Sequence, residues 1–372
     1  MDNLFQNHEV VKLALDYPVL SPLVIYSSLL LLALYPGKKS ENPSFLSRQV
    51  TVELRGLAIL LVIVGHIGVH ILIPEQHGHF PVLGQYGVSI FFLLSGYGLT
   101  RSYFSRPLMA GEFIRRRLSR VMIPYWIVTA IIVTLDTVVL DKSYTLTDLA
   151  ATLLGFNASL VVRSIDYVRW YITVLLIWYF LFMLIWKTMR GRKRKALCCF
   201  GIGSILIICD YYIYSIGYAY LSFPFGVVIG LYYDELYNLY KAIPKNRLLL
   251  GAGAVILANW LFRSFLLEYI DVFMPTIGMA FIAELSWLLV ASSLAIIASV
   301  LIPFYSPFLY IIGKYSYGIF LLHGALMIKY DFFLFRGYLF LTFWLSFILV
   351  VFSSIIMEEF VFKKVHKLNL LH

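Results

Sequence analysis

An uncharged run of 18 residues, Leu57–Pro74, constrains the fold of this chain more than any other feature. Its sequence, LAILLVIVGHIGVHILIP, contains no Asp, Glu, Lys or Arg. An α-helix of this length spans nearly the thickness of the hydrocarbon core of a bilayer. The run therefore predicts a membrane-spanning helix.

Two ionisable residues, Arg55 and His66, lie on one face of this predicted helix. They are eleven residues apart, which corresponds to three turns plus about 20°, with an axial separation of about 16 Å. Ionisable groups at membrane depth usually face a cavity or the interior of a helix bundle. The pair is a candidate functional site; the alternative is that Arg55 reaches the lipid headgroups and His66 only packs.

The composition excludes a soluble domain of useful size. Of 372 residues, 61% are hydrophobic and 13% are charged, about half the charged fraction of a typical soluble protein. The net charge of +10 lies in short loops, where membrane orientation requires basic residues, and it indicates no nucleic-acid partner. Cys198, Cys199 and Cys209 share one apolar segment and indicate neither a disulfide framework nor a metal site.

The distribution of apolar segments predicts an all-α polytopic membrane protein with about eleven transmembrane helices. A shorter amphipathic piece, 146–162, is expected at the outer surface or re-entering the membrane. The predicted spans are residues 19–35, 57–74, 83–100, 121–140, 168–186, 196–214, 217–233, 247–267, 283–302, 308–328 and 338–358.

Lysine and arginine predict the orientation of these spans. Alternate loops and the C-terminal tail carry 23 of the 30 Lys and Arg residues, and basic loops stay in the cytoplasm. The N-terminus is therefore expected outside and the C-terminus in the cytoplasm. Arg55 is then at the cytoplasmic side, and His66 is in the middle or outer half of the membrane.

Three further motifs carry candidate site residues. In the run Gly87–Gly98, Ser95 and Tyr97 are candidate cavity-lining residues, although its small residues also suit close helix packing. Arg117 and Arg120 share a helix face and suit phosphate oxygens; contact with anionic lipid heads explains the same cluster equally well.

Later in the chain, Ser316 and His323 are seven residues apart and fall within about 20° on one helix face. His323 is expected either to line the same cavity as His66 or to be buried by packing. Trp170 stands at the outer mouth of a span, where an aromatic belt alone explains it. His66 and His70 have metal-ligand spacing, but no carboxylate within a span completes a ligand set, and no metal is predicted.

These motifs resemble those of the membrane acyltransferase-3 family. Arg55-x10-His66, GVSIFFLLSGYGLT, FIRRRLSR-x3-PYW and IGKYSYGIFLLH occur in the family's order, and the resemblance covers about 53–358. It implies a bundle of about ten helices that moves an acyl group, commonly acetyl, from cytoplasmic acyl-CoA to sugars exposed outside the bacterial inner membrane. The domains implied are an extra N-terminal helix with its linker (1–50), an acyltransferase membrane domain (51–360) and a basic cytoplasmic tail (361–372).

The resemblance also implies roles for individual residues. The family's arginine–histidine motif falls on Arg55 and His66, and its R-x-x-R motif falls on Arg117 and Arg120. His66 would be the general base or a transient acyl carrier, and the three arginines would bind acyl-CoA, with no permanently bound cofactor. The chain departs from the family by its extra N-terminal helix, by lacking an SGNH-type esterase domain, and by having Ser89 where many members are acidic.

A glycan exporter, flippase or proton-coupled carrier is the alternative function. Intramembrane histidines suit proton transfer. Against this alternative, the chain shows no internal inverted repeat, and Asp136, Asp210 and Glu284 are almost the only carboxylates inside its spans.

Overall fold

The protein is helical throughout its described part. The computed structural model describes residues 20–37, 44–70, 81–105, 110–157, 165–213, 218–264, 277–301, 306–330, 332–335 and 337–364. Within these ranges there are helices and connecting turns but no β-strand, which confirms the predicted all-α fold.

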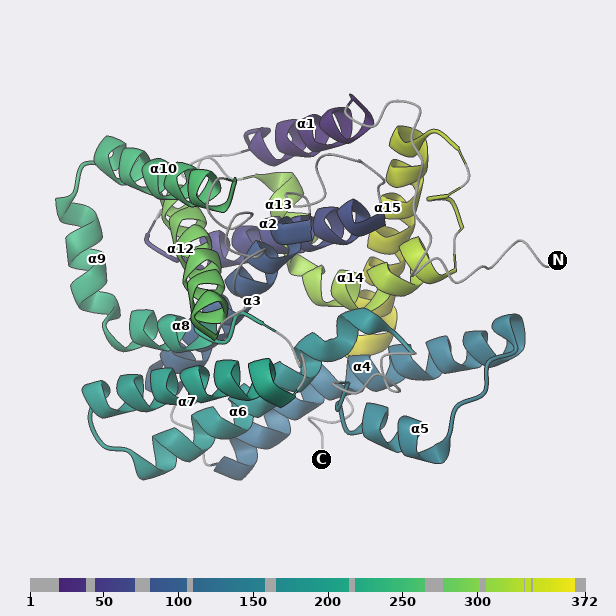
Figure 1. Ribbon diagram of the computed structural model, residues 1–372, viewed down its shortest axis with the longest axis horizontal. Helices are drawn as coiled ribbons and strands as arrows, with labels where there is room; N and C mark the ends of the chain where they lie inside the picture. Colours follow the sequence, from purple (N-terminus) through teal and green to yellow (C-terminus); the bar gives the residue numbers. More distant parts are fainter. Residues whose placement is uncertain are drawn as a thin grey trace.

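Figure 1 shows the helices in chain order, from purple to yellow. The first half contains α1 (Leu20–Leu34), α2 (Arg48–His70), α3 (Pro81–Ser105), α4 (Ala110–Leu140), α5 (Leu146–Leu153), the 3₁₀ turn η2 (Tyr167–Arg169), α6 (Trp170–Thr188) and α7 (Arg192–Ile213). The second half contains α8 (Ser222–Leu231), α9 (Tyr233–Ala242), α10 (Lys245–Phe262), α12 (Ile277–Leu301), α13 (Pro307–Lys314), α14 (Ser316–His323), the π-helix η4 (Gly324–Lys329), α15 (Leu339–Ile356) and the π-helix η5 (Met357–Phe362).

Several of these helices qualify as membrane spans. Among the described residues, α2, α4, α6, α7, α12 and α15 continued by η5 give six helices long and apolar enough to cross a membrane. The pair α13 and α14–η4, bent by 67°, would be a seventh. The protein is thus a multi-pass membrane protein, and the number of eleven stays a prediction.

The predicted span 217–233 is shorter in the structure, because its helix α8 has only ten residues. The carboxylate of Glu284 accepts hydrogen bonds from the backbone N–H groups of Ala219 (2.5 Å) and Leu221 (3.1 Å) just before the helix begins. The polar helix α9 follows α8 directly and has Asp234 and Glu235 in its first turn. A buried carboxylate from a distant helix therefore sets where α8 starts, and a charged turn follows its end.

Glycines bring the central helices into backbone contact. A Cβ added to Gly313 of α13 would lie 1.8 Å from the carbonyl oxygen of Val52 in α2, and one on Gly56 would lie 2.1 Å from the carbonyl oxygen of Leu309. Helix α3 approaches α8 in the same way, since a Cβ on Gly226 would lie 2.0 Å from the carbonyl oxygen of Leu93. Small residues allow this close approach in membranes, so α2, α3, α8 and α13 form a tightly packed centre.

A methyl group at this contact is expected to destabilise the protein. We expect Gly313→Ala to lower the melting temperature in detergent, because the added carbon overlaps Val52 and overpacking costs about 1–3 kcal/mol or more. Gly253→Ala in α10 is the matched control: a Cβ there meets no atom within 4 Å, and alanine favours a helix by about 0.5–1 kcal/mol. Equal melting temperatures for the two variants would contradict the packing described here.

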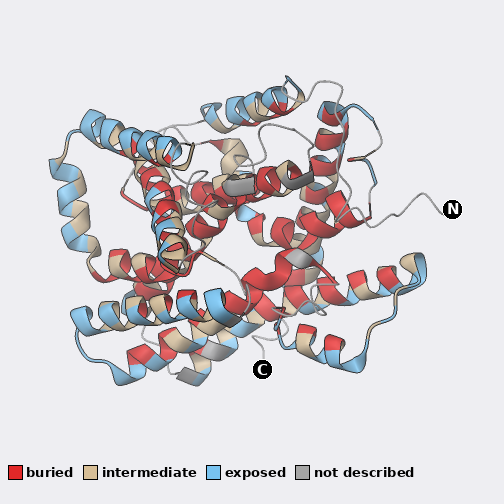
Figure 2. Ribbon diagram, viewed as in Figure 1, coloured by how far each residue is buried: buried red, intermediate tan, exposed pale blue. Residues whose placement is uncertain are grey.

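Exposed residues gather on the outer helices (Figure 2), and many of them are apolar. Leu31 of α1, Leu250 of α10 and Phe352 of α15 are 71%, 72% and 61% exposed. In a multi-pass membrane protein such surfaces face lipid, where exposed apolar side chains cost nothing. The polar and ionisable groups that are buried in the bundle are therefore the ones that require an explanation.

Candidate active site

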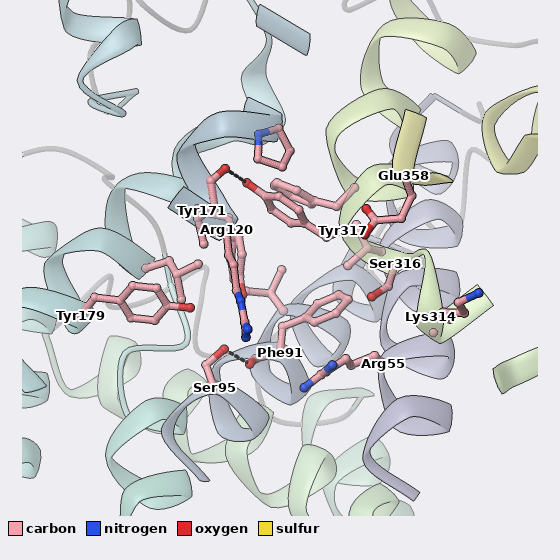
Figure 3. A pocket seen from close by; sticks show the side chains of 17 residues that line it. Arg55, Phe91, Ser95, Arg120, Tyr171, Tyr179, Lys314, Ser316, Tyr317 and Glu358 are labelled. Atoms are coloured by element: carbon pink, nitrogen blue, oxygen red, sulfur yellow. Dashed lines mark hydrogen bonds between the residues drawn. The ribbon is translucent and has the colours of Figure 1, made fainter. Parts of the chain in front are cut away.

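A cavity of about 430 Å³ lies inside the bundle (Figure 3). Seven segments contribute to its wall: α2, α3, α4, α6, α13, α14 and η5. The lining residues are Arg55, Val62, Val88, Phe91, Ser95, Arg120, Val121, Pro124, Tyr171, Leu175, Tyr179, Gly313, Lys314, Ser316, Tyr317, Phe320 and Glu358.

One end of the cavity is basic. The side chains of Arg55 and Arg120 are both exposed and both line the cavity, so each is accessible there although other helices surround it. Among the described residues, no carboxylate forms an ion pair with either one, whereas Lys314 is held by Glu359 at 3.2 Å. Two arginines that pair with no described carboxylate favour an anionic ligand, and phosphate matches the guanidinium fork.

Further along α2 the wall becomes apolar. Val62 lies about two turns beyond Arg55 on the same helix, and it lines the cavity together with Val88, Phe91 and Phe320. All but Phe91, which is half-buried, are buried. The cavity thus combines a charged end with an apolar end, as required by a ligand with an anionic head and a less polar arm.

Two histidines pair one turn beyond this apolar end. His66 follows Val62 by four residues on α2, and His323 follows Phe320 by three on α14. Nδ1 of His66 is 2.8 Å from Nε2 of His323, and the two rings are nearly parallel, with centroids 5.0 Å apart and planes inclined by 9°. The contact between Gly313 and α2 at the other end brings α14 alongside α2, and the histidine pair follows from it.

The hydrogen bonds of His323 determine which ring nitrogen carries each proton. Nδ1 of His323 is 2.8 Å from the carbonyl oxygen of Phe320, and a carbonyl oxygen can only accept, so this nitrogen must carry a hydrogen. In a neutral ring, Nε2 of His323 is then an acceptor, and Nδ1 of His66 must donate to it. The lone pair of a neutral His66 is therefore on Nε2.

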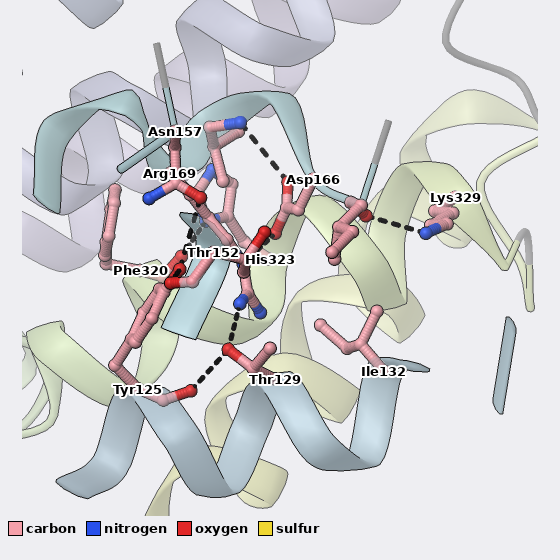
Figure 4. Close-up of polar contacts among 12 residues, drawn as sticks. Tyr125, Thr129, Ile132, Thr152, Asn157, Asp166, Arg169, Phe320, His323 and Lys329 are labelled. Atoms are coloured by element: carbon pink, nitrogen blue, oxygen red, sulfur yellow. Dashed lines mark hydrogen bonds and ion pairs between the residues drawn. The ribbon is translucent and has the colours of Figure 1, made fainter. Parts of the chain in front are cut away.

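A buried ion pair stands behind His323 (Figure 4). Oδ2 of Asp166 accepts from Nε of Arg169 at 3.3 Å, with both side chains at most 2% exposed. A Cβ on Gly324, the residue after His323, would lie 2.8 Å from Oδ1 of Asp166. Glycine at this position allows the carboxylate to approach the histidine's backbone.

The structure brings some of the predicted site residues to the cavity and leaves others away from it. Arg55, Arg120, Ser95 and Ser316 line the cavity, and His66 and His323 lie beyond its apolar end. The side chain of His70 lies outside what the structure describes.

Arg117, Tyr97 and Trp170 are not among the lining residues of this cavity. Arg117 donates to the hydroxyl of Ser102 at 3.1 Å. The Tyr97 hydroxyl donates to the carbonyl oxygen of Leu46 at 3.3 Å. Trp170 packs against the ring of Tyr218, with centroids 4.4 Å apart.

Some lining residues were missed in the sequence. Phe91 and Phe320 precede Ser95 and follow Ser316 by four residues, so helical periodicity from those serines would have found them. Tyr179 and Glu358 carry no such signal, because they reach the cavity only through the packing of α6 and η5 against the central helices. The described residues contain no group of three or more His, Cys, Asp or Glu side chains arranged to hold a metal.

The fold and this site define a multi-pass membrane protein, helical in its described part, with a candidate active site in a cavity lined by its helices. The model of an acyltransferase domain family matches residues 54–358. The chain belongs to this family, the membrane acyltransferase-3 family, and is a membrane acyltransferase. Comparisons with curated proteins and with solved structures find no match.

Proposed function

We propose that this protein transfers an acyl group, most simply acetyl, from acyl-CoA to a hydroxyl group of a cell-surface or lipid-linked glycan. The observation that carries the proposal is the form of the cavity: two arginines at one end that form no ion pair with a carboxylate of the described residues, and an apolar wall that leads toward paired histidines. Coenzyme A has the complementary form, with phosphates at one end and a long arm that ends in the thioester.

The arginines and the histidine act on different parts of the donor. Arg55 and Arg120 bind phosphate oxygens by charge-assisted hydrogen bonds. The pantetheine arm then follows the wall past Val62 toward His66, a distance along α2 of about 16 Å. This arrangement brings the thioester carbonyl to the histidine while the nucleotide stays at the basic end.

His66 then acts as the general base. Its Nε2 takes the proton from the acceptor hydroxyl as that oxygen attacks the thioester carbonyl carbon. A carbon–oxygen bond forms, the carbon–sulfur bond breaks, and the same proton passes from Nε2 to the departing thiolate. The products are the acylated acceptor and free coenzyme A, with no net change in protons.

The two substrates approach from opposite sides of the membrane in this proposal. Loops expected on the Arg55 side hold most of the lysines and arginines, which favours a cytoplasmic location for the basic end. The protein is located in the bacterial inner membrane, and the acceptor reaches His66 from the outer face of that membrane. Anionic lipids around the basic loops are further partners.

The test is thiol release from acetyl-CoA by the purified protein. Free thiol should appear only when a suitable glycan hydroxyl is present, and acylated glycan should accumulate in equal amount. Transport of the glycan without release of thiol would contradict the proposal and favour a carrier.

The arginines are expected to control the Michaelis constant for the donor. Arg120→Lys keeps the charge but loses the fork that binds phosphate through two hydrogen bonds. The loss of one charge-assisted bond costs about 1.5–3 kcal/mol, which is about a tenfold to hundredfold rise in KM for acetyl-CoA. KM for the glycan should hardly change.

Arg115→Lys is the matched control, because Arg115 is exposed on the same helix but does not line the cavity. Arg117→Lys should raise the donor KM less than Arg120→Lys, since Arg117 already donates to Ser102. If the Arg120→Lys variant bound the donor normally, the basic cluster would serve only to orient the protein in the membrane.

A further inference from the structure

His323 is held at both of its ring nitrogens. Nδ1 contacts the carbonyl oxygen of Phe320, and Nε2 contacts Nδ1 of His66, both at 2.8 Å. Turning the ring by 180° about its bond to Cβ would put carbon atoms at both contacts and lose both hydrogen bonds. Only 1% of the residue is exposed, so neighbouring side chains also restrain the ring, and its orientation is fixed.

We propose that His323 is a positioning residue that holds His66 as the tautomer protonated on Nδ1. The proposal rests on the proposed function, in which Nε2 of His66 takes the proton of the acceptor hydroxyl. A solvated neutral imidazole exchanges between two tautomers, and only one of them offers a lone pair at Nε2. The hydrogen bond to His323 selects that tautomer and also fixes the plane of the His66 ring.

His323 has a second effect after the proton has moved. The His66 imidazolium carries hydrogens on both nitrogens, and its Nδ1–H remains hydrogen-bonded to Nε2 of His323. The carboxylate of Asp166 lies against Gly324, next to His323, but Arg169 neutralises its charge, so the hydrogen bond to His323 is the contact that stabilises the imidazolium. A buried neutral histidine thus occupies the place that a carboxylate has in a Ser-His-Asp triad.

The backbone around His323 supports this role. Gly324 begins the π-helix η4 directly after His323, and π-helical turns are rare and frequently found at functional sites. Phe320, whose carbonyl oxygen accepts from His323, also lines the cavity with its ring. One short stretch of α14 therefore provides both a cavity wall and the group that orients the base.

Two substitutions at this position separate positioning from packing. In His323→Gln the amide oxygen can still accept the hydrogen of His66 Nδ1, whereas in His323→Leu a side chain of similar size offers no acceptor. We expect His323→Leu to lower kcat by about 10²–10³-fold, with little change in the donor KM. This loss of kcat is smaller than the loss of about 10⁴-fold that a wrong tautomer causes in a serine protease. His323→Gln should retain activity within about tenfold of the wild-type protein.

Leu322→Met is the packing control, because Leu322 is buried on the same helix and this exchange conserves volume. Its kcat should stay close to that of the wild type. Equal activities of the Gln and Leu variants, or an effect of Leu on the donor KM alone, would overturn the positioning role.

A measurement without substrate distinguishes this inference from the proposed function. ¹⁵N NMR of histidine-labelled protein in detergent reports which ring nitrogen of His66 is protonated, with His66→Ala used to assign its signals. We expect a single tautomer protonated on Nδ1 in the wild type and in His323→Gln, and a mixture of tautomers in His323→Leu. A mixture in the wild type overturns the inference, whereas failure to release thiol from acetyl-CoA with a well-defined tautomer overturns only the proposed function.

Discussion

Replacing His66 with alanine is expected to abolish acyl transfer while the protein stays folded in the membrane. General acid–base catalysis by a positioned side chain contributes about 10²–10⁴-fold to a rate, so kcat should fall at least a hundredfold. Binding of acetyl-CoA should persist, because Arg55 lies about three turns away on α2 and Arg120 is on a different helix, α4. Thiol release and direct measurement of donor binding, made on the same preparation, test both halves of this expectation.

His70→Ala is the control for this experiment. The residue is one helical turn beyond His66 in sequence, and nothing in the proposed mechanism depends on its side chain. It should lose much less activity. Retention of more than a few per cent of activity in His66→Ala would exclude His66 both as general base and as acyl carrier.

The second large effect is expected from a buried ion pair between α4 and η4. Nζ of Lys329 is 2.5 Å from Oδ2 of Asp136, and the two side chains are 2% and 0% exposed. The hydroxyl groups of Tyr330 and Tyr144 also donate to Asp136, and Lys329 donates to the carbonyl oxygen of Ile165 at 2.7 Å. Lys329→Met would leave a buried carboxylate without its cation, at a cost of about 3–5 kcal/mol.

The melting temperature in detergent is the measurement, and two variants serve as comparisons. Lys363→Met removes a lysine that pairs with Glu359 but is 47% exposed, so it should change the melting temperature much less. The double variant Asp136→Leu with Lys329→Met should recover stability relative to Lys329→Met, because no unpaired charge remains. A double variant less stable than the single one would show that this pair stabilises the fold by more than mutual neutralisation.

The same pair shows what the sequence could and could not predict. Asp136 and Glu284 were visible as carboxylates inside predicted spans, and their scarcity counted against a carrier. Their partners were not visible: Lys329 is 193 residues away from Asp136, and Glu284 pairs with backbone N–H groups, which leave no trace in a pattern of side chains. A hydropathy pattern reveals that a charged residue lies in an apolar span, but it does not reveal which group neutralises that charge.

Arg55 and His66 could be predicted to share a helix face from their spacing alone. This was possible because one continuous helix, α2, carries both residues. Helical periodicity also identified His323 as a second intramembrane histidine. Its direct contact with His66 depends on the packing of α14 against α2 across 257 residues of sequence. Spacing within one helix says which residues share a face, but it does not say what faces them.

Local patterns failed where tertiary contacts decide the outcome. Arg117 and Arg120 look equivalent in sequence, yet Arg120 lines the cavity while Arg117 turns to Ser102. The bend of 67° between α13 and α14 follows Gly313 and Lys314, in a segment that contains no proline between Pro307 and Lys329. The span 308–328 was predicted without a break, although Gly313 and Lys314 are local signals against one continuous apolar helix.

The glycine contacts have a consequence for how the cavity opens. Since the backbones of α2 and α13 already touch at Gly56 and Gly313, these helices cannot slide past each other without collision, and one wall of the cavity is rigid. The opposite wall, on α4 and α6, contacts the cavity through large side chains such as Tyr171 and Tyr179. Any widening of the cavity to admit a substrate would then come from the side of α4 and α6 rather than from sliding of α2 along α13.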